Sequence, residues 1–217
     1  MDKKTETLLS VLKAQPVVPV LMIDDVASAV PLARALVAGG LKAIEITLRT
    51  PAALDAIRAV AEEVEGAVTG AGTILNAEQF EKAEDAGARF IVSPGTTQEL
   101  LDVAKKSDVP LLPGAVTASE VMALREEGYR VLKFFPAEQA GGAAYLKSLS
   151  SPLAGTLFCP TGGISPKNAM DYLSLPNVVC VGGSWVAPKD MVAAGDWAGI
   201  TALAAEAVRI RSGGTIV

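Results

Sequence analysis

The stretch AIEITLRTPAALDAIRAVAEEVEG, residues 43–66, contains one complete strand-and-helix unit. Residues 43–48 form a short, largely apolar run of β type, which predicts a strand. Thr50 and Pro51 provide a helix start, and Gly66 can take the left-handed conformation that ends a helix. A strand followed at once by a helix is the building unit of α/β proteins with parallel sheets.

This unit recurs along the whole chain. Polar residues with N-cap chemistry precede several of the helical stretches, as at Asn76 with Gln79, Thr96 with Glu99 and Thr117 with Glu120. A short glycine-rich segment near residue 184 could open one further short helix. The predicted strands cover residues 17–23, 43–48, 67–70, 89–92, 109–112, 131–134, 156–159 and 178–181.

Eight strands alternating with helices in 217 residues predict an α/β fold, a single (β/α)8 TIM barrel over residues 1–217. The first 15 residues carry an amphipathic pattern, so an extra N-terminal helix is expected, and the final helix is expected over residues 200–211. The alternative is an open doubly wound sheet. The first strand is not followed by G-x-G-x-x-G, which argues against that alternative.

Composition narrows the class of partner. The net charge of -5 comes without a basic cluster, so we expect no nucleic acid, and charges, Gly or Pro interrupt every apolar run before it could span a membrane. The first 15 residues lack a signal peptide's apolar core, and Cys159 and Cys180 form no C-x-x-C pair. We therefore expect a cytoplasmic protein that binds a small molecule. Histidine is absent, so proton transfer must use other groups.

Lys133 is the most unusual residue of a strand. It lies in the apolar run Val131-Leu132-Lys133-Phe134-Phe135, near the strand's C-terminal end, where barrels place their active sites. Only a neutral amine attacks a carbonyl, and burial favours the neutral form. The sequence thus indicates a Schiff-base lysine. The alternative is a stem packed on the sheet with its ammonium at the rim. Lys42 begins its strand at the opposite end, and the other lysines fall on helices or surface loops.

Glu45 is a carboxylate inside the predicted strand of residues 43–48. Period-two alternation places it on the face opposite Ile44 and Ile46, so it should point into the barrel. It is a candidate proton-transfer group, or alternatively a structural ion-pair partner of Lys133, and both roles place the two residues together. Asp24, Asp25 and Glu138 also follow strands, but their positions favour helix capping.

Several loops at the predicted barrel mouth could bind anions. Arg49 and Thr73 follow the second and third strands and suit a substrate carboxylate, although Arg49 could simply be a surface arginine. The seventh loop carries Thr161, Gly162 and Gly163, and the eighth carries Gly182, Gly183 and Ser184. Paired glycines in these two loops are typical of the phosphate site recurrent in barrels, whereas each pair alone could be an ordinary turn.

The chain resembles the class I 2-keto-3-deoxy-6-phosphogluconate (KDPG) and 2-keto-4-hydroxyglutarate (KHG) aldolases over nearly its whole length. The shared motifs are PVVPV (16–20), ALVAGG (35–40), EITLRT (45–50), GAGTILN (70–76), SPG (93–95), KFFPAE (133–138), CPTGGISP (159–166) and GGSW (182–185).

The resemblance implies that Lys133 is the Schiff-base lysine and Glu45 the general acid/base. It assigns the keto-acid carboxylate to Arg49 and Thr73, the sugar hydroxyls to Thr161, and the phosphate to Gly162, Gly163 and Ser184. Ala115-Val116 departs from the family, whose members carry a serine just before the threonine at 117, and this leaves sugar specificity open.

The reaction implied by the resemblance is reversible cleavage of KDPG to pyruvate and glyceraldehyde 3-phosphate, the aldol step of the Entner-Doudoroff pathway, with activity on KHG alongside. No metal and no cofactor are expected, since the protonated imine polarises the substrate. The family also implies a homotrimer. Two alternatives from the residues alone are a phosphosugar isomerase and a non-catalytic phosphosugar-binding barrel, neither of which needs an imine.

Overall fold

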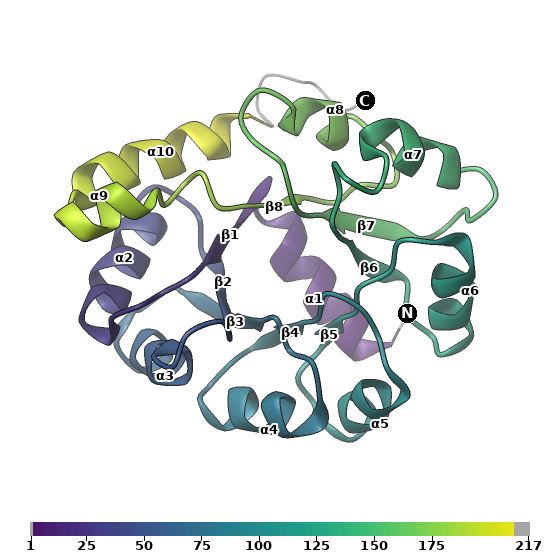
Figure 1. Ribbon diagram of the computed structural model, residues 1–217, viewed down its shortest axis with the longest axis horizontal. Helices are drawn as coiled ribbons and strands as arrows, with labels where there is room; N and C mark the ends of the chain where they lie inside the picture. Colours follow the sequence, from purple (N-terminus) through teal and green to yellow (C-terminus); the bar gives the residue numbers. More distant parts are fainter. Residues whose placement is uncertain (1, 211–217) are drawn as a thin grey trace.

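Eight parallel strands curl into a barrel (Figure 1). Six are hydrogen-bonded in the order β5-β4-β3-β2-β1-β8, and β6 pairs with β7. Bridges from Thr161 to Gly182 and from Gly114 to Lys133 join the two groups and close the ring. The strands are β1 (Val17–Leu21), β2 (Ala43–Thr47), β3 (Val68–Gly72), β4 (Phe90–Val92), β5 (Leu111–Leu112), β6 (Val131–Phe134), β7 (Leu157–Pro160) and β8 (Val181–Gly183).

Helices surround this ring in the computed structural model, which describes residues 2–210. The TIM-barrel prediction is confirmed, and so is the extra N-terminal helix. The helices are α1 (Lys3–Lys13), α2 (Val26–Ala38), α3 (Ala53–Glu63), α4 (Ala77–Asp85), α5 (Gln98–Lys106), α6 (Ala118–Glu126), α7 (Gly142–Leu149), α8 (Ala169–Leu173), α9 (Lys189–Ala194) and α10 (Trp197–Arg209).

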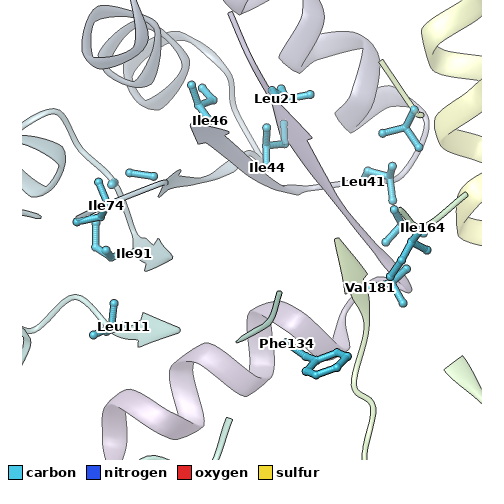
Figure 2. Packing of buried hydrophobic residues seen from close by; sticks show 14 of the residues in the cluster. Leu21, Leu41, Ile44, Ile46, Ile74, Ile91, Leu111, Phe134, Ile164 and Val181 are labelled. Atoms are coloured by element: carbon cyan, nitrogen blue, oxygen red, sulfur yellow. The ribbon is translucent and has the colours of Figure 1, made fainter. Parts of the chain in front are cut away.

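Two apolar layers fill the molecule. The outer layer lies between strands and helices and contains Ile44, Ile46 and Phe134 (Figure 2). The inner layer fills the barrel, where Phe90 and Val131 lie in one cluster with residues of α1. The helix α1 crosses the centre of the ring in Figure 1, and its buried leucines Leu8, Leu9 and Leu12 close the N-terminal end of the barrel. The C-terminal end is thereby the one that stays open to ligands.

Several predicted boundaries were wrong, and the two at glycine share a cause. The third strand continues to Gly72 and the eighth runs from Val181 to Gly183, beyond the predicted ends at residues 70 and 181. The predicted strands ended with the apolar runs before these glycines. The glycines nevertheless continue the hydrogen-bonded strands, at positions where a side chain would collide with a neighbour. A Cβ on Gly182 would stand 2.3 Å from the Thr161 hydroxyl oxygen.

Four helix starts also differ from the predictions. Thr50 does not cap α3, because its hydroxyl donates to the Ile23 carbonyl, and the helix begins at Ala53 after Ala52, which makes no side-chain capping bond. Thr97, not Thr96, caps α5, because the Thr96 hydroxyl donates instead to the Gly114 carbonyl. Ser184 opens a turn rather than a helix, and the short helix α9 begins only at Lys189. The helix α10 begins at Trp197, where the Asp196 carboxylate accepts from the Gly199 N–H, and the predicted end at residue 211 lies outside the described residues. The caps at Asn76 and Thr117 are confirmed.

Candidate active site

Lys133 and Glu45 meet inside the barrel. Lys133 belongs to β6 and Glu45 to β2, and alternation turns both side chains inward while Ile44 and Ile46 face the helices. The Lys133 Nζ lies 3.4 Å from Glu45 Oε1, and the two side chains are only 3% and 4% exposed. An amine and a carboxylate at this distance, shielded from water, can exchange a proton directly or through one water molecule.

A glycine makes room for this pair. A Cβ built on Gly72 would stand 2.0 Å from Glu45 Oε1, so no other residue fits at this position of β3 without displacing the carboxylate. On the other side, the Lys133 Nζ lies 5.3 Å from the centroid of the Phe135 ring. The Glu45 carboxylate therefore lies against the backbone of Gly72, and the Lys133 amine lies near the ring of Phe135. Electrostatic interactions are strong in such a buried site.

Arg49 and Thr73 lie together on the neighbouring loops that follow β2 and β3. The Arg49 Nε donates to the Thr73 hydroxyl at 2.9 Å. Thr73 has a φ of 60°, the one left-handed non-glycine residue among residues 2–210, and such strained conformations cluster at functional sites. Within the described chain, the terminal nitrogens of the Arg49 guanidinium donate to no residue, so they can bind a carboxylate in the forked geometry typical of arginine.

The glycine loop after β7 presents backbone donors. The carbonyls of Thr161 and Gly162 accept hydrogen bonds from Ala137 N at 2.8 Å and Glu138 N at 3.2 Å. In a trans peptide the N–H points opposite to the carbonyl, so the N–H groups of Gly162 and Gly163 point away from residues 137 and 138. The Gly162 N–H points to the Gly182 carbonyl across the bridge between β7 and β8, whereas the Gly163 N–H donates to no described residue. Gly162 and Gly163 have φ values of 105° and 73°, in the region that favours glycine, and the Gly163 N–H is available to an anion.

A cavity of about 850 Å³ opens at this end of the barrel. Its wall includes Arg49, Thr161 and Ser184. Neither Lys133 nor Glu45 lines it, but Phe135 and Thr47 do, each two residues further along the same inward face. The amine and carboxylate thus lie directly beneath the cavity floor.

The cavity wall also contains residues that the sequence did not single out. Trp185 packs across Gly183, where a Cβ would stand 1.9 Å from its ring, and Lys189 adds a second cation to the wall beside Arg49. The sequence pattern had placed Lys189 with the lysines of helices and surface loops. No local signal distinguishes it, because only the turn from Ser184 to Ala187 brings the start of α9 to the barrel mouth.

Three further groups that the sequence analysis considered, Asp25, Glu138 and the two cysteines, have structural roles. Asp25 caps α2 by accepting from the Ala27 N–H at 3.1 Å, as predicted. The same prediction for Glu138 was wrong, because its carboxylate accepts a hydrogen bond from the Tyr172 hydroxyl. Cys159 and Cys180 are buried in the inner layer with their Sγ atoms 3.4 Å apart.

Neither a metal cluster nor a membrane-spanning helix occurs in the part of the chain that the structure describes. No three side chains of His, Cys, Asp or Glu there are grouped so that they could hold a metal ion. None of the helices between residues 2 and 210 is both long and apolar enough to cross a membrane.

One protein family matches most of the chain. The family model described as KDPG and KHG aldolase matches residues 8–203. The 2-dehydro-3-deoxy-phosphogluconate aldolase of Pseudoalteromonas atlantica is 56% identical and covers 89% of this chain and 90% of its own. The KHG/KDPG aldolase of Escherichia coli is 51% identical, over 92% of this chain and 93% of its own.

Solved structures agree with these relatives. The KDPG aldolase of Zymomonas mobilis, crystallised with 3-phosphoglycerate, superposes with a TM-score of 0.91 at 50% identity, over 95% of this chain and 97% of that one. The KDPG aldolase of Legionella pneumophila, with pyruvate captured as a covalent carbinolamine, gives a TM-score of 0.90 at 45% identity, over 92% and 97%. The resemblance seen in the motifs is confirmed, and this chain belongs to the KDPG and KHG aldolase family.

Proposed function

We propose that this protein is a class I aldolase that reversibly cleaves KDPG to pyruvate and glyceraldehyde 3-phosphate through a Schiff base on Lys133. The observation that carries the proposal is the buried pair of Lys133 and Glu45, 3.4 Å apart beneath a cavity with anion-binding groups. Imine chemistry needs an amine and a proton shuttle at one place, and an isomerase or a sugar-binding barrel does not need this pair.

The reaction follows from the positions of these two side chains. The neutral Lys133 amine attacks the C2 ketone to give a carbinolamine, and Glu45 delivers the proton with which the hydroxyl leaves as water. A base removes the C4 hydroxyl proton, the C3–C4 bond breaks, and its electron pair moves into the protonated imine. Glyceraldehyde 3-phosphate departs, and the enamine is protonated at C3. Water then hydrolyses the pyruvate imine and restores the amine.

Groups around the cavity bind the two charged ends of the substrate. Arg49, whose terminal guanidinium nitrogens donate to no described residue, and Thr73 hold the carboxylate next to the ketone. Thr161, at the end of β7, contacts the sugar hydroxyls. The loop of Gly162 and Gly163, together with Ser184 on the next loop, binds the phosphate. The Gly163 N–H supports this role because it donates to no described residue, and all three residues line the cavity.

KHG is a second substrate in this proposal. It carries the same 2-keto acid end, which Arg49, Thr73 and Lys133 engage, and it lacks the phosphate. The Escherichia coli relative bears both activities in its name. The homotrimer and the cytoplasmic location remain predictions, and light scattering after size-exclusion chromatography tests the trimer.

Trapping of the imine tests the proposal. Borohydride reduces an imine to a stable amine, so treatment in the presence of pyruvate should attach a three-carbon adduct to Lys133, located by peptide mass mapping. Lys42 is exposed at the other end of its strand and serves as the internal control. Lys133→Arg should give no adduct and no turnover, since a guanidinium stays protonated. An adduct on Lys42, or none on Lys133, would refute the mechanism.

A further inference from the structure

The Asn168 side chain fixes the peptide unit between Gly163 and Ile164 through a hydrogen bond to its carbonyl. The Asn168 Nδ2 donates to the Gly163 carbonyl at 3.1 Å, and its Oδ1 accepts from the Ser165 N–H at 2.8 Å. One amide group therefore fixes both ends of the loop segment 163–165. Because the Gly163 carbonyl points to Asn168, the N–H of Ile164 points the opposite way, and it donates to no described residue.

With this contact, three consecutive carbonyls of the loop each accept a hydrogen bond. The carbonyls of Thr161, Gly162 and Gly163 bind Ala137 N, Glu138 N and Asn168 Nδ2 in turn. Of the N–H groups that follow them, that of Gly162 points to the Gly182 carbonyl across the bridge between β7 and β8. Those of Gly163 and Ile164 are left without a described partner, and both residues line the cavity. Two consecutive donors can bind one anion only while the carbonyls behind them stay fixed.

Glu138 supports the same loop by packing. A Cβ on Gly163 would stand 2.6 Å from the Glu138 Cγ and 2.8 Å from its Cβ, so the Glu138 stem lies directly against this glycine. Its carboxylate is held by the hydroxyl of Tyr172, whose ring is fully buried in α8. Burial, with the Glu138 carboxylate as a further cause, raises the pKa of Tyr172, so the phenol remains a donor.

We propose that Asn168 and Glu138 are positioning residues that hold the Gly163 and Ile164 N–H groups in line with the substrate phosphate. The inference rests on the proposed function, because it concerns the phosphate end of the same site. Neither side chain lines the cavity, so both act through the loop rather than on the substrate. Misalignment of a bound group by about 1 Å can cost roughly 100-fold in rate, so loss of either support should be measurable.

The experiment compares a phosphate-dependent reaction with a phosphate-free one. Asn168→Ala and Glu138→Ala should lower kcat/KM for KDPG by roughly 10- to 100-fold, mainly through KM, and should weaken competitive inhibition by inorganic phosphate. The rate of borohydride trapping with pyruvate should stay within about 2-fold of the parent, because the imine site is untouched. Glu138→Gln keeps the stem and an oxygen for Tyr172, and it should restore KM.

Asp196→Ala is the matched control. It removes one hydrogen bond between a side chain and a backbone N–H at the start of α10, and Asp196 does not line the cavity. We expect no change in either reaction. If Asn168→Ala does not fold, Glu138→Ala carries the test, because this side chain is exposed.

The outcomes separate this inference from the proposed function. Equal losses in KDPG cleavage and pyruvate trapping, or no loss in either, would refute the positioning role in a variant whose circular dichroism matches the parent. Absence of a pyruvate adduct in the parent protein would instead refute the aldolase mechanism itself.

Discussion

Replacing Glu45 by glutamine separates its catalytic role from a structural one. Glutamine has nearly the same shape as glutamate, so it fits the space beside Gly72, which has no side chain. The substitution removes the negative charge 3.4 Å from Lys133 Nζ. At that distance two unit charges attract by about 5 kcal/mol when the effective dielectric constant is about 20. Removal of one partner of a buried pair costs about 3 to 5 kcal/mol of stability.

The two roles predict different measurements. For a chain of this length each kcal/mol corresponds to about 2 to 4 °C in Tm, so a purely structural role lowers Tm by about 6 to 20 °C and leaves turnover of the folded protein unchanged. A proton-transfer role lowers kcat by roughly 10²- to 10⁴-fold at temperatures where the variant is folded. We expect the fall in kcat, and imine trapping should be slowed without being abolished.

The assay follows release of pyruvate from KDPG at saturating substrate, with circular dichroism at the same temperature to confirm folding. Borohydride trapping with pyruvate is timed in parallel. An unchanged kcat in folded Glu45→Gln would show that the carboxylate is only an ion-pair partner, and the mechanism would then need another proton donor.

Further expectations concern the glycine beside Glu45, the phosphate loop and a helix cap. Gly72→Ala would force its Cβ to within 2.0 Å of Glu45 Oε1, so kcat should fall at least 10-fold. Gly95→Ala should match the parent, because apart from the chain neighbours no described residue lies within 4 Å of the new Cβ, and equal activities of the two variants would contradict the crowding argument. Ser184→Asp places a like charge beside the phosphate, so kcat/KM should fall roughly 10- to 100-fold for KDPG and much less for KHG, and parallel losses would move the phosphate site elsewhere. Backbone N–H donors at the start of α6 lower the pKa of Glu120 in the folded protein. Its contribution to the free energy of unfolding is therefore present above the unfolded pKa near 4.3 and is lost as pH falls below that value. Glu120→Ala should therefore lower Tm by about 2 to 4 °C at pH 7 and by nearly nothing near pH 3, and a pH-independent difference in thermal melts would argue against the cap.

The strand pattern was predictable because side-chain direction along a strand depends on local geometry alone. Alternation in residues 43–47 correctly turned Glu45 away from Ile44 and Ile46, and an isolated amine in an apolar run distinguished Lys133. Strand ends were less predictable at Gly72 and Gly183, where the missing side chain is required by neighbours from distant parts of the chain.

The sequence by itself determined the order of strands and helices, the extra N-terminal helix and the face on which each polar strand residue lies, because these follow from periodicity and capping over a few residues. Only the tertiary structure decided which of those faces meet. Lys133 and Glu45 are 88 residues apart along the chain, and barrel closure brings them to 3.4 Å. The same holds for Lys189 at the cavity and for Asn168 behind Gly163, since the direction of a loop is set by the elements that it touches and not by its own residues.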